Sequence, residues 1–333
     1  MKSKTIEKKY LLAFVLVTVC FALWGFANDI TNPMVKAFSK IFRMSVTDGT
    51  LVQVAFYGGY FCMALPAALV IRKFSYKVGL LVGLGLYAVG SLMFLPAQLI
   101  GNYYPFLLSY FILTCGLSFL ETSANPYILS MGDSENATRR LNLAQAFNPI
   151  GSLLGMYVAM NFIQNKLNPL STSERAILSE SQFEMIKEAD LSVLSAPYIV
   201  IGIVLIVMFV LFAFFLPKSR DTKEDNSDSI AKTAKRLWYN KRYRYGVVTQ
   251  FFYVGVQIMC WTFIIQYGTS VFMKEGMSEL DAEVTSQKYN IIAMIAFCAS
   301  RFVCTWLMKY IKASKLLTLF SCIAICLMLG VIF

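Results

Sequence analysis

The chain has 333 residues, of which 57% are hydrophobic and only 15% are charged, and its formal net charge is +11. Soluble domains are about 45–50% apolar and about 25% charged, so this composition excludes an ordinary water-soluble protein. The sequence has no histidine, which excludes histidine-based zinc sites and Ser-His-Asp catalysis. The basic residues crowd the ends of apolar runs, where they signal membrane topology, so we expect no nucleic acid partner.

Several apolar runs are near 20 residues long, enough to cross a hydrocarbon core of about 30 Å as a helix. Such continuous runs differ from the short alternating strands of a β-barrel. The sequence therefore predicts an all-α polytopic membrane protein. It has about nine predicted spans, at residues 10–31, 49–71, 76–98, 104–131, 140–164, 196–216, 245–272, 284–308 and 314–333.

The basic connectors predict the orientation of these spans. Four lysines precede the first span, namely Lys2, Lys4, Lys8 and Lys9. The connectors after spans two, four and eight are also basic, so the positive-inside rule places them in the cytoplasm with the N-terminus. The connector after span one disagrees, because Lys36, Lys40 and Arg43 fall on the predicted outer side. The other connectors outnumber it.

A long charged connector divides the chain. Its first part, residues 217–227, is predicted to be flexible, and its second part has the basic residues of an amphipathic helix on the inner membrane surface. Six spans, a basic cytoplasmic loop and further spans are typical of a two-halved transporter. We therefore predict an N-terminal six-helix half at 1–216, a linker at 217–244 and an incomplete C-terminal half at 245–333. Because the last apolar run stops at Phe333, we expect a truncated protein that lacks about three spans.

Polar side chains recur at helical spacing inside the predicted spans. They are Asn28, Asp29 and Asn32 in span one, Glu121 and Asn125 in span four, Asn142, Gln145 and Asn148 in span five, and Gln250 and Gln257 in span seven. Residues three or four apart share a helix face, so each span presents one polar wall. Amides and carboxylates suit sugar hydroxyls. Nearby aromatic side chains could stack on the apolar face of a sugar ring; they are Trp24, Phe26, Tyr253 and Trp261.

The alternative interpretation of these polar residues is structural. Hydrogen bonds between membrane helices contribute about 0.6 kcal/mol per pair on average, and for any single amide both interpretations stay open. A charged side chain at a helix centre costs roughly 2.5–3.5 kcal/mol on insertion scales. An acid such as Glu121 therefore favours a function, as does the polar set taken together.

Three sequence runs resemble the L-fucose permease family of the major facilitator superfamily. They are Phe21-Ala22-Leu23-Trp24-Gly25-Phe26-Ala27-Asn28, Leu120-Glu121-Thr122-Ser123-Ala124-Asn125-Pro126-Tyr127 and Arg140-Leu141-Asn142-Leu143-Ala144-Gln145-Ala146-Phe147-Asn148. Tyr253-Val254-Gly255-Val256-Gln257 with Cys260-Trp261 extends the likeness into the second half. The resemblance implies the major facilitator fold of twelve helices, of which about nine are present, with the sugar held between two halves. It also implies a proton-coupled sugar symporter of the bacterial inner membrane, with L-fucose or glucose and galactose as substrate.

By position, Glu121 matches the family's proton-coupling glutamate, and Gln145 and Asn148 match a sugar-facing pair. The sequence departs from the family at Asn32, where L-fucose permeases carry an aspartate; here the acid is Asp29, about one turn earlier. Three explanations stay open. Asp29 takes over the role, coupling rests on Glu121 alone, or the substrate differs.

The combined prediction is proton-coupled sugar uptake, with L-fucose preferred and glucose or galactose as the alternative. A non-transporting sugar sensor and a truncated fragment also stay open, whereas a membrane enzyme is disfavoured because the acids lie inside spans. The predicted proton-coupling residues are Glu121 and Asp29. The predicted substrate-binding residues are Phe26, Asn28, Asn32, Asn125, Gln145, Asn148, Gln257 and Trp261. We expect a monomer in a lipid bilayer, with a monosaccharide and protons as ligands and with neither metal nor cofactor.

Overall fold

The computed structural model describes residues 6, 8–170, 172–217 and 229–332. All regular elements in this part of the chain are helices. Eight helices are long and apolar enough to cross a membrane, or nine if the bent pair Lys241–Trp261 and Phe263–Lys274 is one span. The prediction of an all-α polytopic protein with about nine spans is therefore confirmed. The chain divides into two compact units, unit 1 (Met1–Thr222 with Arg301–Phe333) and unit 2 (Lys223–Ser300).

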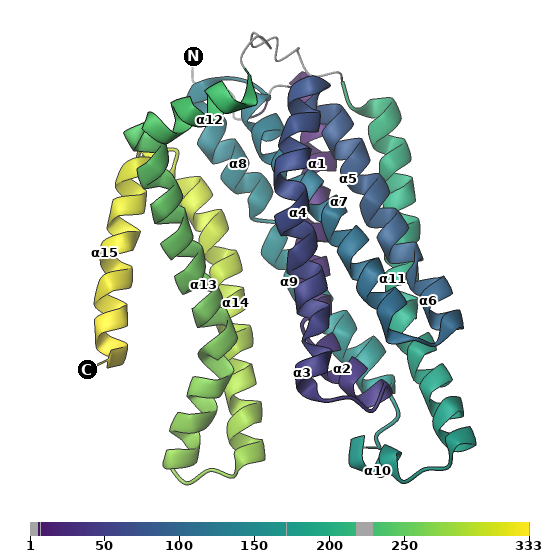
Figure 1. Ribbon diagram of the computed structural model, residues 1–333. Helices are drawn as coiled ribbons and strands as arrows, with labels where there is room; N and C mark the ends of the chain where they lie inside the picture. The colour runs from purple at the N-terminus through teal and green to yellow at the C-terminus, as the bar shows by residue number, and fades with distance from the viewer. Residues whose placement is uncertain (1–5, 7, 171, 218–228, 333) are drawn as a thin grey trace. The chain divides into compact units, whose positions relative to one another are not determined.

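Unit 1 contains a bundle of long helices joined by short ones (Figure 1). Its helices are α1 (Leu11–Thr31), α2 (Met34–Ile41), α3 (Val46–Gly49), α4 (Leu51–Lys73), α5 (Tyr76–Leu92), α6 (Phe94–Ile100), α7 (Tyr103–Ser130), α8 (Ala137–Gln145), α9 (Asn148–Val158), α10 (Thr172–Ala176), α11 (Glu180–Phe215) and α15 (Ala313–Ile332). Two predicted spans are each built from two consecutive helices, α5 with α6 and α8 with α9.

Helix α11 begins well before the span predicted at 196–216. Ser179 and Gln182 form a capping box at its first turn, which satisfies backbone donors that a helix start otherwise leaves unpaired. The polar segment from Glu180 to residue 195, which lies outside the predicted span, is therefore helical. Hydropathy detects only the part of a helix that lies in hydrocarbon, so it missed this polar extension.

Unit 2 contains α12 (Ile230–Tyr239), α13 (Lys241–Lys274) and most of α14 (Glu279–Leu307). Helix α12 confirms the helix predicted in the second part of the linker. The predicted flexible stretch 217–227 lies outside the described residues except for Pro217, as do Lys2 and Lys4. The predicted division into halves at 216 and 244 stays a prediction.

Small residues allow the helices of unit 1 to approach closely. A Cβ atom added to Gly83 or Gly90 of α5 would overlap backbone atoms of α7. One added to Gly151 of α9 would overlap the carbonyl group of Ala22 in α1. Such close backbone contacts stabilise helix pairs in membranes, where the lipid is as apolar as the side chains.

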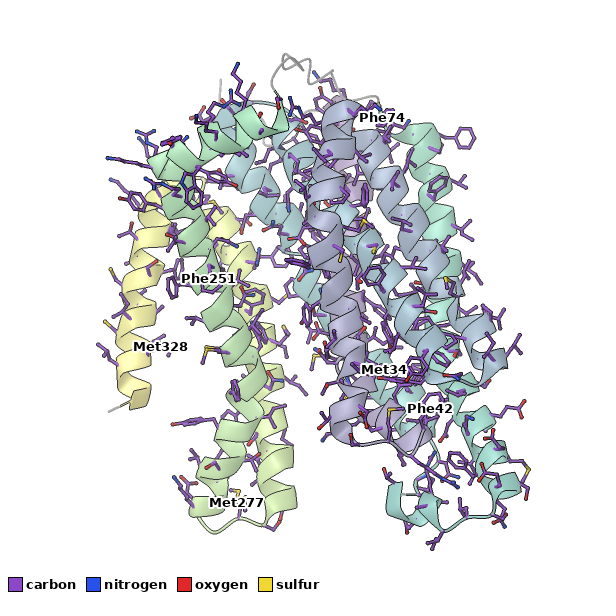
Figure 2. All side chains as sticks on the ribbon, in the orientation of Figure 1. Met34, Phe42, Phe74, Phe251, Met277 and Met328 are labelled. Atoms are coloured by element: carbon purple, nitrogen blue, oxygen red, sulfur yellow. The ribbon has the colours of Figure 1, made fainter. Side chains whose placement is uncertain are left out.

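Aromatic side chains fill one end of the bundle in unit 1. Phe94 of α6 stacks on Tyr198 of α11 with ring centroids 4.0 Å apart, and the Tyr198 hydroxyl lies 2.7 Å from that of Tyr110 in α7. Figure 2 places Met34 and Phe42 at this end of the unit and Phe74 at the opposite end. The aromatic cluster thus joins α6, α7 and α11 on the side predicted to face outward.

Two of the three basic residues that disagreed with the charge rule, Lys40 and Arg43, have structural roles. The Lys40 ammonium donates to the carbonyl oxygen of Asn168 at 2.6 Å, and burial together with the nearby Arg175 lowers the pKa of Lys40. Arg175 forms an ion pair of 2.6 Å with Asp190, and both side chains are buried. The Arg43 guanidinium lies 3.3 Å from the ring centroid of Phe183. These contacts hold the segment around α10 against α2 and α11.

Two bases of the inner connectors cap helix ends. Arg140 is fully buried and donates to the carbonyl oxygens of Ile128 and Leu129, at 3.1 and 2.8 Å, where α7 ends. Lys77 donates to the carbonyl oxygens of Ala213 and Leu216, at 2.8 and 2.7 Å, where α11 ends. Cations at helix C-termini satisfy unpaired carbonyl groups and the helix dipole.

Candidate functional site

Glu121 of α7 faces a cavity of about 680 Å³ between α4 and α7. The cavity is lined by Tyr57, Tyr60, Phe61, Ala64, Ser118, Glu121, Thr122, Asn125 and Pro126. Within the described residues, no hydrogen bond or ion pair reaches the Glu121 carboxylate oxygens. An acid at this depth without a counter-ion is suited to bind and release a proton, because protonation removes the cost of its charge.

A chain of hydrogen bonds leads from this cavity across unit 1. The Asn125 amide donates to the carbonyl oxygen of Glu121 at 3.1 Å. The Gln145 amide of α8 donates to the Asn125 side-chain oxygen at 3.0 Å, and the Arg301 guanidinium of α14 donates to the Gln145 side-chain oxygen at 3.1 Å. The structure therefore brings together Glu121, Asn125 and Gln145, all three from the predicted site.

The span that carries Gln145 is interrupted immediately after it. Helix α8 ends at Gln145 and α9 begins at Asn148, with Pro149 in the first turn of α9. Proline is favoured at this position because the first turn of a helix needs no backbone N–H bond there. The Asn148 amide consequently donates to the carbonyl oxygen of Phe21 in α1, at 3.2 Å, rather than to the Gln145 network. Asn142 donates to Thr305 Oγ1 at 2.7 Å.

Asp29 lies in a second polar cluster on α1. The Asn32 amide donates to the Asp29 carboxylate at 3.3 Å, as their spacing of three residues predicted. Gln53 of α4 donates to the Asn32 side-chain oxygen at 3.5 Å, and the Ser152 hydroxyl of α9 lies beside the carboxylate. Asp29 thus has hydrogen-bonding neighbours from α1 and α9, whereas the described part of the chain offers no hydrogen bond to the Glu121 carboxylate.

The remaining predicted residues differ in their surroundings. Asn28 donates to the carbonyl oxygen of Trp24 in its own helix at 3.2 Å, and Phe26 is half-buried. Gln257 and Trp261 belong to α13 in unit 2, where Trp261 packs edge-on against Phe297 with ring centroids 5.4 Å apart.

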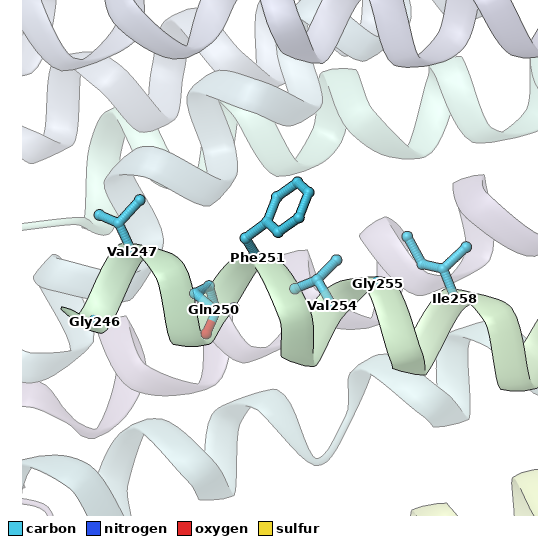
Figure 3. A pocket seen from close by; sticks show the side chains of 7 residues that line it. All are labelled: Gly246, Val247, Gln250, Phe251, Val254, Gly255 and Ile258. Atoms are coloured by element: carbon cyan, nitrogen blue, oxygen red, sulfur yellow. The ribbon is translucent and has the colours of Figure 1, made fainter. Parts of the chain in front are cut away.

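Helix α13 also carries a separate hollow of about 540 Å³, shown in Figure 3. Its lining residues are Gly246, Val247, Gln250, Phe251, Val254, Gly255 and Ile258. Gln250 is the one polar side chain among them, and a single amide cannot satisfy the hydroxyls of a sugar. This hollow is therefore a poor candidate for the sugar site.

The wall that α4 contributes to this cavity was not predicted from the sequence. Tyr57, Tyr60 and Phe61 are spaced at i, i+3 and i+4, so they share one helix face and line the cavity of Glu121. This aromatic spacing within span two was the available signal. Arg301 of α14 also belongs to the polar network, because its guanidinium donates a hydrogen bond to the Gln145 side-chain oxygen. No cluster of three or more metal-ligating side chains occurs in the described ranges.

A bundle of long apolar helices with an unpaired acid and amides around a cavity defines a multi-pass membrane transporter rather than an enzyme. The family model of the Major Facilitator Superfamily matches residues 17–333. An L-fucose-proton symporter of Haemophilus influenzae is 47% identical over 100% of this chain and 77% of its own length. A glucose/galactose transporter of Brucella abortus is 29% identical over 97% of this chain and 73% of its own length.

A crystal structure of the Escherichia coli fucose:proton symporter FucP gives the corresponding comparison of folds. It superposes with a TM-score of 0.83 at 31% identity, and the match covers 96% of this chain and 76% of that one. The chain therefore belongs to the major facilitator superfamily and, within it, to the L-fucose permease family.

Proposed function

We propose that this protein couples the uptake of L-fucose to the entry of protons by alternating access. Two observations support this choice of sugar. The L-fucose-proton symporter of Haemophilus influenzae is 47% identical, whereas the glucose/galactose transporter of Brucella abortus is 29% identical. The polar side chains around the cavity are amides and hydroxyls, which suit a neutral sugar.

The observation that carries the proposal is the unpaired carboxylate of Glu121, which faces a cavity. When Glu121 is ionised, closing the site around it leaves a charge in a low-dielectric medium, and this raises the free energy of the closed state. A proton that enters from the outside neutralises Glu121 and removes this cost. The loaded protein then rearranges, and the proton leaves towards the cytoplasm with the sugar.

The sugar contacts follow from the same network. Asn125 and Gln145 lie next to Glu121 and are hydrogen-bonded to each other. A sugar hydroxyl that replaces this hydrogen bond is held close to the proton carrier Glu121. Asn28, Asn32 and Asn148 provide further amides within unit 1. Gln257 and Trp261 of α13, in unit 2, stay substrate-binding residues predicted from the sequence. Phe26 shapes the apolar side of the site. Tyr57 and Phe61 of α4 are exposed aromatic rings in the cavity wall, which suits stacking on the sugar ring.

Asp29 is the second acid of the proposed coupling mechanism. Its hydrogen bond from Asn32 links it to the position where relatives in the family carry an aspartate. The amide of Asn32 and the hydroxyl of Ser152 lie beside its carboxylate. We assign Asp29 a supporting role in proton coupling, while Glu121 carries the transported proton.

The proposed location is the bacterial inner membrane, with the N-terminus in the cytoplasm. The basic connectors support this orientation through the positive-inside rule. We further propose that the protein works as a monomer, since one chain supplies all the side chains of the site. The lipid bilayer surrounds its apolar exterior.

Glucose or galactose transport is the second candidate, because Asn32 replaces the acid that L-fucose permeases carry at that position. Competition decides between the two. Uptake of labelled L-fucose that is blocked only by unlabelled L-fucose supports the first proposal. Uptake of labelled glucose or galactose without uptake of L-fucose supports the second.

The direct test measures uptake of labelled L-fucose into proteoliposomes with and without an inward proton gradient. We expect Glu121→Gln to abolish accumulation against the sugar gradient and to retain sugar-for-sugar exchange, because a permanently neutral residue still allows the loaded protein to rearrange. Glu188→Gln, an exposed position of α11, is the matched control and should accumulate sugar normally. Full gradient-driven accumulation by Glu121→Gln would exclude Glu121 as the carrier. Sugar binding without any flux would identify a sensor instead.

A further inference from the structure

Two polar atoms are buried beside the Glu121 cavity, the indole nitrogen Nε1 of Trp24 in α1 and the hydroxyl of Tyr60 in α4. Within the described part of the chain neither atom has a hydrogen-bond partner, although the two groups are neighbours. Buried polar groups normally have a hydrogen-bond partner, because a buried donor without an acceptor destabilises the protein. The pair therefore suggests a partner that it binds in another state of the protein.

The position of Tyr60 identifies that partner. Tyr60 lines the same cavity as Glu121, and its hydroxyl is within electrostatic reach of the Glu121 carboxylate. The Ser118 hydroxyl of α7 contacts the carbonyl oxygen of Tyr60 at 3.4 Å. Since Ser118 and Glu121 are three residues apart on α7, they share the face that meets α4.

The donors and acceptors of Trp24, Tyr60 and Glu121 can all be satisfied in a single arrangement of hydrogen bonds. Tryptophan can only donate, an ionised carboxylate can only accept, and a tyrosine hydroxyl can do both. The order Trp24 to Tyr60 to Glu121 therefore satisfies every group when Glu121 is ionised. A bond to a carboxylate is stronger than one to a neutral carboxyl group, so this order favours the ionised form.

We propose that Tyr60 is a positioning residue for the proton step, whose hydroxyl donates to the ionised Glu121 carboxylate while Trp24 donates to Tyr60. The inference rests on the proposed role of Glu121 as proton carrier. The tyrosine stabilises the proton-free carboxylate and so sets the pH at which Glu121 releases its proton. Protonation of Glu121 weakens the bond from Tyr60, because a neutral carboxyl group is a poorer acceptor than a carboxylate.

Other titratable groups on the elements around Glu121 have different contacts. Tyr57 of α4 lines the cavity, and the carboxylate that acts on it electrostatically is Asp29 of α1. Four titratable side chains of α5 and α8 donate to backbone carbonyl groups away from Glu121; they are Lys77, Tyr87, Arg139 and Arg140. The ring of Tyr76 in α5 packs against that of Tyr127. Arg301 of α14 donates to Gln145, and α6 has no titratable side chain. Tyr60 is thus the group placed to act on Glu121.

The test follows the protonation of Glu121 directly, by infrared absorption of its carboxyl group in purified protein in nanodiscs titrated with pH. The band is assigned by its loss in Glu121→Gln. Tyr60→Phe should raise the pH midpoint by about one unit, the expected scale for one charge-assisted hydrogen bond. Trp24→Phe should shift it less in the same direction. Tyr57→Phe, on the same cavity wall, is the matched control and should leave the midpoint unchanged.

An unchanged midpoint in both Tyr60→Phe and Trp24→Phe would overturn the proposal, whatever happens to the transport rate. An equal shift in Tyr57→Phe would also overturn it, because the effect would then reflect the cavity wall in general. The titration needs no sugar, so it can succeed even if L-fucose is not the substrate. If Glu121 does not titrate at all, the proposed function fails at the carrier itself, and the exchange assay with Glu121→Gln reveals this separately.

Discussion

Asparagine and glutamine residues that recur at helical spacing within the spans make different kinds of contact in this protein. Asn28 binds a carbonyl group of its own helix, which any membrane helix tolerates at little cost. Gln145 instead connects α7 and α14 through Asn125 and Arg301. The contacts of the side chain, and not its type, separate an amide that is bonded within its own helix, such as Asn28, from one that links two helices, such as Gln145.

Substitution of Gln145 tests this distinction at the level of one residue. Gln145→Leu removes the donor to Asn125 and the acceptor of Arg301 while it keeps a similar volume. We expect the KM for sugar uptake to rise about tenfold, which corresponds to about 1.4 kcal/mol and is typical of one hydrogen bond.

Initial rates of uptake measured over a range of sugar concentrations will show the change in KM. Asn161→Leu is the control, since the Asn161 amide is exposed and donates within its own turn to Tyr157 at 3.0 Å. A KM for Gln145→Leu equal to that of Asn161→Leu would show that Gln145 only joins helices.

At the scale of elements, the outer segment around α10 depends on charges buried between helices. Arg175 and Asp190 form an ion pair with 0% and 2% of their side chains exposed, and Lys40 holds the same segment through Asn168. The polar start of α11 thereby becomes part of the packed unit. Lys40 and Arg175 thus stabilise the fold of this segment, which is predicted to lie on the outer side of the membrane.

Removal of one partner of this pair should destabilise the protein strongly. Asp190→Ala leaves the Arg175 guanidinium buried without its counter-ion, which costs about 3–5 kcal/mol in comparable cases. We expect a clear decrease in the melting temperature in detergent. Glu184→Ala breaks the exposed pair with Lys187 and should change stability by at most about 1 kcal/mol. Equal melting temperatures for the two variants would contradict the role assigned to the buried pair.

At the scale of the whole molecule, the order of spans and connectors sets the topology. The bases around α7 and α8 and those after α14 are predicted to lie in the cytoplasm, whereas the start of α11 is predicted to lie outside. The sites on α7 and α8 then lie within the membrane between these two ends. Transport by alternating access requires this arrangement.

Labelling of single cysteines checks the orientation. In a background where the eight native cysteines are replaced, Ser181→Cys should react with a membrane-impermeant maleimide in intact cells. Ser314→Cys should react only after permeabilisation. Both positions are exposed, so accessibility to the reagent depends on the side of the membrane. The reverse pattern would invert the proposed orientation.

The sequence by itself determined the class and the approximate number of spans, and it predicted the acids of the candidate site. Transfer of apolar side chains into hydrocarbon is a property of each segment, so runs of about 20 apolar residues reveal the spans without any tertiary information. An acid such as Glu121 is conspicuous within such a run for the same reason. The family motifs added the two amides of α8 and α9, Gln145 and Asn148.

Only the tertiary structure decided which residues meet. The aromatic wall of α4 around Glu121 and the link from Gln145 to Arg301 depend on close packing between helices far apart in sequence. Pro149 interrupts a span that the apolar pattern shows as continuous, so Gln145 and Asn148 bind different partners. Hydropathy measures the affinity of each segment for lipid. It contains no information on the packing of one helix against another, and this packing builds the site.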